Sequence, residues 1–325
     1  MSTLIKEFES LSKRTVKAGN IPVTQIPKFR KHKLGINENG TPVFFIHCTD
    51  TSGQRPVDSN LDLISIEFNK QCELRTTDNK RIQGTYTIIS LKTDSLEITR
   101  YFLEIILLML LNLPDKITMV DLRKELAKIV TLFSKLTEPA IKSLQGLWAE
   151  LLVIERSSNP QYLIESWHIS ATDTFDFNDG ADKIEVKSTS RNRRVHTFSI
   201  EQLNPNSNSS LLIASVLVIQ SGLGKNITQL IGLIEKKVSS PYSLFLLKEK
   251  VALCLGKDID NTQDVYFDYS HSADSLSFYK SESIPKIDSK AIPLEISNIH
   301  FNCDISKVKP CNKKDVKGKL LKQAF

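Results

Sequence analysis

The sequence contains no long hydrophobic run. A membrane-spanning helix needs about 20 consecutive apolar residues, whereas the strongest candidate, Ile105–Leu111, has only seven. We therefore expect neither a helical membrane span nor a membrane partner. The segment is better explained as a buried helix that begins near Asp94 or Ser95 and ends before Pro114.

Cysteine is scarce and has no paired spacing. The 325 residues include five cysteines, an odd number. With no secretory leader recognised in the sequence, this pattern predicts reduced thiols in a cytoplasmic protein rather than a disulfide framework. His300 and Cys303 have no second pair at ligand spacing, so a structural zinc site is not expected. Walker motifs, dinucleotide fingerprints and serine-nucleophile elbows are also missing, which removes several common enzyme classes.

The charge balance is mildly basic. The 43 basic and 37 acidic side chains give a formal net charge of +6, which is compatible with a polyanionic partner such as DNA. Residues 28–33 form a basic run around Phe29, either as a solvated loop or as a contact for a nucleic-acid backbone. Lysine is also frequent between residues 307 and 322.

The most informative pattern is an acid followed, nine positions later, by an acid and a lysine two residues apart. These residues are Asp176, Glu185 and Lys187. Side chains alternate between the faces of a strand, so Glu185 and Lys187 point in the same direction. The intervening residues 178–181 favour a turn, and Gly180 can adopt a positive φ. The sequence therefore predicts a hairpin that brings the three polar side chains together.

Such a group suits metal-dependent hydrolysis of a phosphodiester. Asp176 and Glu185 are hard oxygen ligands for Mg²⁺, with Mn²⁺ as an alternative. Lys187 could hold or deprotonate the attacking water, or offset charge that builds on the phosphate. The same three residues could instead form a charge network on a solvated strand face.

Flanking segments supply further candidates. Apolar spacing predicts a helix from about Glu138 to Glu155, with Pro139 in its first turn. Glu150 lies at the edge of the apolar arc of this helix, from which it could reach a site between helix and sheet; Glu155 is a reserve candidate.

A strand and a short helix are expected downstream of the lysine. Val195–Phe198 reads as the strand, and Ser199 as the N-cap of the helix that carries Gln202. Gln202 and His196 could each hold a phosphate oxygen or a metal-bound water. A purely structural role for both residues is the alternative.

These motifs together resemble the PD-(D/E)XK nuclease superfamily, and within it a family found near restriction and phage-defence genes. The resemblance covers residues 146–219. Its elements are Gly146-x-x-x-Glu150, Phe175-Asp176-Phe177, Glu185-Val186-Lys187-Ser188, and Arg194-x-His196-x-Phe198-Ser199 followed by Gln202-Leu203. The proline that often precedes the aspartate in this superfamily is Phe175 here.

The resemblance implies an α/β (α+β) fold with a restriction-endonuclease-like core, in which a mixed sheet is flanked by helices. It implies a catalytic set of Glu150, Asp176, Glu185 and Lys187, with Gln202 in support and Glu150 as an additional or water-mediated metal ligand. The expected activity is a Mg²⁺-dependent DNA endonuclease of restriction or phage defence. The alternative is a catalytically inactive subunit of the same fold that binds DNA or assists assembly.

The patterns of apolar and turn-forming residues divide the chain into four segments. The expected segments are a mostly β domain over 1–92 for recognition or docking, a helical connector over 93–137, the nuclease core over 138–240, and a β-containing extension with a basic tail over 241–325.

DNA is the expected substrate, and protein partners are also expected. Because cutting a duplex needs two active sites, a homodimer is expected. An ATPase or methylase subunit of a restriction system is a further candidate partner.

Overall fold

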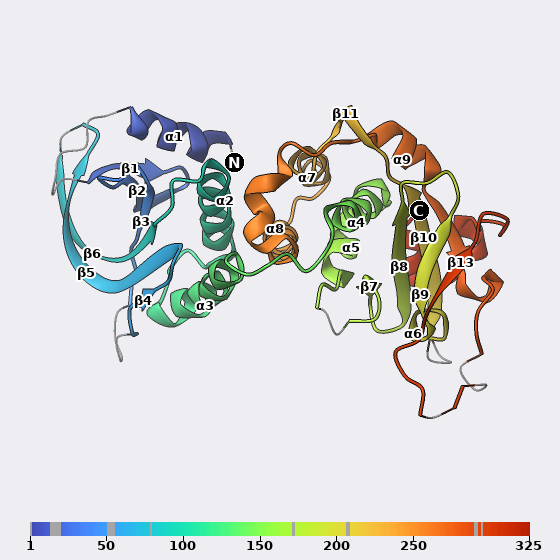
Figure 1. Ribbon diagram of the computed structural model, residues 1–325. Helices are drawn as coiled ribbons and strands as arrows, with labels where there is room; N and C mark the ends of the chain where they lie inside the picture. The colour runs from blue at the N-terminus through green and yellow to red at the C-terminus, as the bar shows by residue number, and fades with distance from the viewer. Residues whose placement is uncertain are drawn as a thin grey trace. The chain divides into compact units, whose positions relative to one another are not determined.

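The chain folds into two compact units, Met1–Pro139 and Ala140–Phe325. The computed structural model describes residues 2–13, 21–50, 56–78, 80–170, 173–205, 209–288, 292–293 and 295–325. Both units combine helices with sheets, which confirms the expected α/β class (Figure 1). Of the four segments expected from the sequence, the first two fall in the first unit, and the last two, apart from residues 138 and 139, fall in the second.

The first unit is built on a curled six-stranded sheet of order β1-β2-β3-β6-β5-β4. Neighbouring strands run antiparallel, but β1 also pairs in parallel with β5, so the sheet bends back on itself. Its strands are β1 (Pro22–Ile26), β2 (Phe29–Ile36), β3 (Pro42–Ile46), β4 (Ser59–Asn60), β5 (Ile64–Thr76) and β6 (Arg81–Leu91).

Helices α1 (Ser2–Ser12), α2 (Leu96–Asn112) and α3 (Met119–Lys135) complete this unit. The ring of Phe102 on α2 lies 5.5 Å from that of Phe44 on β3 and 5.8 Å from that of Phe133 on α3. The apolar run of α2 is therefore explained by packing on two sides. Its N-cap is Ser95, as expected, and no described helix is long and apolar enough to cross a membrane.

Residues 29–33 of the basic run lie in a strand rather than in a solvated loop. Lys28 has a positive φ of 72° and precedes β2, which begins at Phe29. His32 and Lys33 are buried, and the amide of His47 donates to His32 Nδ1 at 3.1 Å. The pairing of β2 with β1 and β3 accounts for the difference, because a run of charges does not by itself reveal a strand.

The second unit contains a four-stranded sheet of order β12-β10-β8-β7. Strands β8 and β10 are parallel, with Glu185 beside Ile213 and Lys187 beside Ser215, while β7 and β12 run antiparallel to their neighbours. The strands of this sheet are β7 (Phe177–Asn178), β8 (Asp182–Thr189), β10 (Ser210–Leu217) and β12 (Ser277–Lys280). The unit also contains the two-stranded ribbon of β9 (Val195–Ser199) and β13 (His300–Asp304), and the strand β11 (Gln220–Lys225), which lies outside both sheets.

The two faces of this sheet are covered differently. Helix α4 contacts β8 and α7, whereas Leu211 and Ile213 of β10 pack with Phe198 of β9 on the other face (Figure 1). The helices are α4 (Leu144–Arg156), α5 (Pro160–Ser166), α6 (Ile200–Leu203), α7 (Ile227–Glu235), α8 (Pro241–Leu255), α9 (Tyr269–Ser275) and α10 (Lys319–Gln323), with 3₁₀ turns η1 (Gly256–Thr262), η2 (Ser281–Ser283) and η4 (Lys313–Asp315).

The start of α4 differs from the sequence expectation. The helix begins at Leu144 rather than near Glu138, and Pro139 lies outside it. Proline disfavours a helical conformation in the residue before it, and the Ser143 hydroxyl caps the helix by accepting a hydrogen bond from Gly146 N at 3.1 Å. Residues 138–143 therefore lead into the helix as an irregular segment.

The predicted hairpin is present at the edge of the sheet. Phe177 pairs with Ile184 and Asn178 with Lys183, and Gly180 in the turn has a φ of +92°. This pairing sets the register between Asp176, which directly precedes β7, and Glu185.

We expect Gly180→Ala to lower the free energy of unfolding by about 1–2 kcal/mol, because a side chain is strained at this positive φ. No atom lies within 4 Å of the added Cβ, so backbone strain alone is measured. Gly222 also has open space but no positive φ, and Gly222→Ala is the matched control. Urea denaturation of both variants checks the expectation; equal stability would show that the turn does not constrain the hairpin.

Candidate active site

Asp176 stands at the centre of a cluster of charged side chains. One carboxylate oxygen, Oδ2, accepts a hydrogen bond from the backbone N–H of Val186 at 2.8 Å. The other, Oδ1, accepts from Lys142 Nζ at 2.8 Å. The first bond ties the residue before β7 to β8, next to Glu185. The hairpin therefore fixes the position of this carboxylate.

Glu185, Lys187 and Gln202 form a closed triangle of contacts. Lys187 Nζ lies 2.8 Å from Glu185 Oε1 and 2.9 Å from Gln202 Oε1. Gln202 Nε2 donates to the same Glu185 oxygen at 2.6 Å. Glu185 and Lys187 alternate onto one face of β8 as expected, and the lysine also lies 5.1 Å from the centre of the Phe198 ring. The ammonium is thus held in one orientation.

Gln202 is itself fixed by the start of α6. The Ser199 hydroxyl accepts from the amide of Gln202, while Gln202 Oε1 accepts from the amide of Ser199 at 3.2 Å. This capping box anchors the end of β9 and the first turn of α6. The N-cap that the sequence indicates therefore also positions a side chain of the cluster.

Glu150 reaches the cluster from α4 and is fully satisfied there. Its exposed fraction is 4%. Both of its oxygens lie 2.6 Å from Lys142 Nζ, and the indole N–H of Trp167 donates to Oε2 at 2.6 Å. The sequence reasoning missed Lys142 and Trp167. Lys142 lies in the irregular segment before α4 and meets Asp176 across 34 residues, so no local pattern marks it.

The pKa values of the two glutamates, Glu150 and Glu185, are raised. Burial and the charge of Asp176 raise the pKa of Glu150 well above its ordinary range. The same two causes raise the pKa of Glu185 to about 8. Burial alone would lower the pKa of Lys142, but the charges of Asp176 and Glu150 outweigh it and raise that pKa. A cation placed among the three acids would therefore stabilise their ionised forms.

A divalent cation fits the chemistry of this donor set. Among the described residues, no three His, Cys, Asp or Glu side chains are already grouped around one metal position. The ammonium of Lys142 instead lies between Glu150 and Asp176. Oxygen ligands with a shared excess of negative charge are those that Mg²⁺ prefers, and the arrangement already accommodates a cation.

A cavity of about 560 Å³ opens beside the cluster. It is bounded by the residues just before Asp176 and by the first turn of α6. The ammonium of Lys183 lies 5.5 Å from the ring centre of Phe175 at this cavity. The lining residues are His168, Asp173, Thr174, Phe175, Asn178, Lys183, Ile200, Glu201, Asn204 and Pro205.

Comparison with known proteins identifies the family. The family that the chain matches is described as "Putative PD-(D/E)XK family member, (DUF4420)", and the match covers residues 4–306. The chain belongs to this family. The match confirms the expected resemblance to the PD-(D/E)XK superfamily. Neither a curated protein nor a solved structure matches the chain.

Membership supports a nuclease-like function in general terms. Proteins of the PD-(D/E)XK superfamily are generally nucleases, and these nucleases typically use divalent metal ions. In this member the match extends far beyond the motif region of residues 146–219 and includes most of the first unit. The first unit is therefore part of what defines the family.

Glu155 and His196, which the sequence also suggested as site residues, have contacts outside the cluster of Glu150, Asp176 and Glu185. Glu155 binds Lys237 Nζ at 2.7 Å and accepts from the Tyr269 hydroxyl at 2.8 Å. His196 Nε2 is 2.8 Å from the hydroxyl of Ser215. Glu155 thus has an ion pair of its own, and His196 contacts a hydroxyl of β10 that is paired in register with Lys187.

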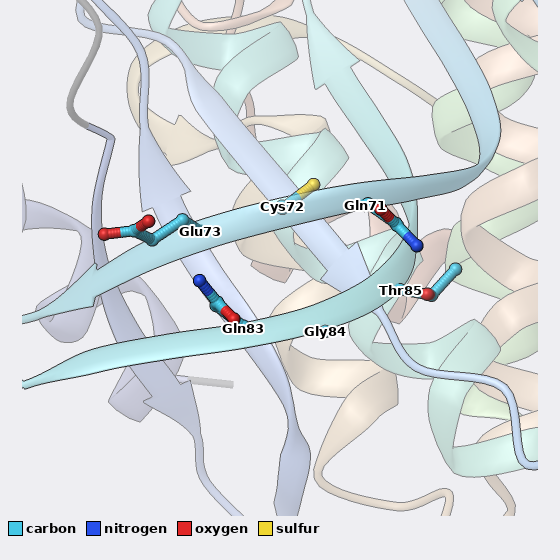
Figure 2. A pocket seen from close by; sticks show the side chains of 6 residues that line it. All are labelled: Gln71, Cys72, Glu73, Gln83, Gly84 and Thr85. Atoms are coloured by element: carbon cyan, nitrogen blue, oxygen red, sulfur yellow. The ribbon is translucent and has the colours of Figure 1, made fainter.

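The first unit contains a pocket whose lining residues differ in type from those of the charged cluster in the second unit. Figure 2 shows its lining residues on the paired strands β5 and β6. The volume of this pocket is about 440 Å³. Its lining offers amide and hydroxyl groups for hydrogen bonds, and a single carboxylate. The residues are Gln71, Cys72, Glu73, Gln83, Gly84 and Thr85. An acid-acid-lysine set like that of the second unit is not among these lining residues.

Acid should destabilise the protein through His196. Burial, followed by the charges of Lys187 and Arg194, lowers the pKa of this imidazole from 6.5 to about 4. Above pH 6.5 the ring is neutral in both states. As the pH falls from 6.5 to 4, His196 binds a proton in the unfolded chain but not in the folded chain. The free energy of unfolding therefore decreases over this range.

We therefore expect His196→Gln to reduce the loss of stability between pH 7 and pH 4.5 by about 2–3 kcal/mol relative to the wild type. Urea denaturation at the two pH values measures this difference. His271→Gln, at an exposed position of α9, is the matched control and should change with pH as the wild type does. Parallel pH profiles for wild type and His196→Gln would contradict the assignment.

Proposed function

We propose that this protein is a Mg²⁺-dependent DNA endonuclease, with Mn²⁺ as an alternative ion, that hydrolyses phosphodiester bonds in a restriction or phage-defence system. The observation that carries the proposal is the fixed arrangement of Lys187 against Glu185 and Gln202, beside Asp176. A surface charge network would not need this burial, since Glu185 is only 5% exposed. Membership of a PD-(D/E)XK family supports the same chemistry.

Asp176 and Glu185 would hold the ion, and Glu150 would act as an additional or water-mediated ligand. When bound, Mg²⁺ would polarise the phosphate and lower the pKa of a water molecule. The chain's own contribution is to keep the carboxylates in place. The backbone N–H of Val186 holds Asp176, and the side chain of Gln202 holds Glu185.

Lys187 would act on the attacking water. Its three N–H donors are compatible with the two contacts to Glu185 and Gln202 and one further contact. That remaining donor can orient a water molecule or offset charge on the phosphate. Gln202 would serve as a positioning residue for Lys187, and His196 would support the same strand position through the hydroxyl of Ser215, which is paired in register with Lys187.

DNA is the proposed substrate, and the cavity at Phe175 and Lys183 is the proposed place for its backbone beside the site. A cation and an aromatic ring at the same wall suit phosphate and base respectively. Because one site cuts one strand, we propose that duplex cleavage requires a homodimer or further subunits of a restriction system, such as an ATPase or a methylase.

Substitution of the central residues should abolish cleavage or slow it strongly. We expect Asp176→Asn to remove Mg²⁺-dependent cleavage, since a ligand charge is lost. Lys187→Met should slow it by roughly 10²–10⁴-fold, which is the usual contribution of a positioned proton-transfer group. Supercoiled, linear and single-stranded DNA incubated with and without Mg²⁺ provide the measurement, with product resolved on gels.

Glu155→Gln is the matched control for Glu150→Gln. Both glutamates are buried on α4, but Glu155 pairs with Lys237 away from the cluster. Only Glu150→Gln should impair cleavage. Equal cleavage by the wild type and the Asp176 and Lys187 variants would contradict the proposed enzyme. Binding of DNA without cleavage by any of them would favour the inactive, DNA-binding subunit instead.

A further inference from the structure

Lys142 occupies the position of a cation between two of the proposed metal ligands. Its ammonium lies 2.6 Å from each oxygen of Glu150 and 2.8 Å from Asp176 Oδ1. No other lysine of the described structure bridges these two acids. Lys187, by comparison, contacts Glu185 and Gln202. The cluster therefore contains one ammonium that shares oxygens with the metal site and one that stands beside it.

We propose that Lys142 is an internal cation that neutralises Glu150 and Asp176 until a divalent ion binds, and that the ion displaces it. The inference rests on the proposed function, because it assumes a metal at Asp176. It adds a residue that sets metal affinity, and it explains how Glu150 becomes available as a ligand. The lysine acts through the two carboxylates that it contacts.

The charge of the cluster favours exchange over joint occupancy. When all three acids are ionised, which is the form that a bound cation favours, Glu150, Asp176 and Glu185 carry three negative charges against the ammonium groups of Lys142 and Lys187. A divalent ion added beside Lys142 would compete for the same oxygens and be repelled at short range. Exchange leaves three negative charges against the ion and Lys187, which balances the site.

Lys142 is also free to withdraw without breaking the fold around it. It lies in the irregular segment before α4, whose N-cap is the next residue, Ser143. Its side chain is 20% exposed, whereas that of Glu150 is 5% exposed. The lysine thus approaches from the solvent side of the buried acid. Its long, flexible chain can turn outward while Glu150 keeps its hydrogen bond from Trp167.

Chemical labelling of the wild-type protein tests displacement directly. The full chain is treated with an amine-acetylating reagent at increasing Mg²⁺, at constant ionic strength, and the acetylation of each lysine is measured by mass spectrometry. We expect labelling of Lys142 to rise severalfold as Mg²⁺ saturates the site. Lys135, which pairs with Glu138 at an exposed position, is the matched control and should not change.

Calorimetric titration with Mg²⁺ supplies the second measurement. Removing the competing charge in Lys142→Met should tighten binding by at least about tenfold, whereas Lys142→Arg, which keeps the charge, should not. Thermal denaturation checks that both variants are folded, and the labelling experiment needs no variant.

The outcomes separate the two proposals. If Mg²⁺ binds but Lys142 stays protected, the internal-cation inference is overturned and the proposed enzyme stands. If neither the wild type nor Lys142→Met binds Mg²⁺, the proposed metal site fails and the inference fails with it. Tighter binding in Lys142→Met together with exposure of Lys142 in the wild type supports both.

Discussion

The carboxylate of Asp176 holds the second unit's charged cluster together. One oxygen is bound by the backbone of β8 through Val186, and the other by Lys142 from the segment before α4. Its charge contributes to the raised pKa of both Glu150 and Glu185. A hairpin edge, a strand and the segment that leads into α4 thus meet at one half-buried carboxylate, and the free energy of this arrangement depends on the cations around it.

Such a cluster is costly for a protein that needs only stability. Buried ion pairs often contribute less than apolar side chains of the same size would, and here three acids are kept beside two lysines. Each contact has a geometric consequence instead: Gln202 orients Lys187, and Trp167 orients Glu150. Polar groups that are fixed at the expense of stability are typical of sites that act on a ligand.

What the sequence could predict depended on distance along the chain. The alternation of Glu185 and Lys187, the Gly180 turn and the Ser199 cap are local, and the structure contains all three. The first turn of α4 was misjudged because apolar spacing continues past the true cap at Ser143. Lys142 and Trp167 meet Glu150 only through the tertiary fold, and a single sequence carries no signal for such contacts.

The central claim is that Asp176 and Glu185 share a divalent ion next to Lys187. A crystal structure of the protein grown with Mn²⁺ tests it most directly, because the anomalous scattering of this ion locates it independently of the model of the protein. The account predicts one anomalous peak within bonding distance of a carboxylate oxygen of each of the two acids. A saturating concentration of Mn²⁺ that gives no peak there, or a peak only at another surface, would contradict it.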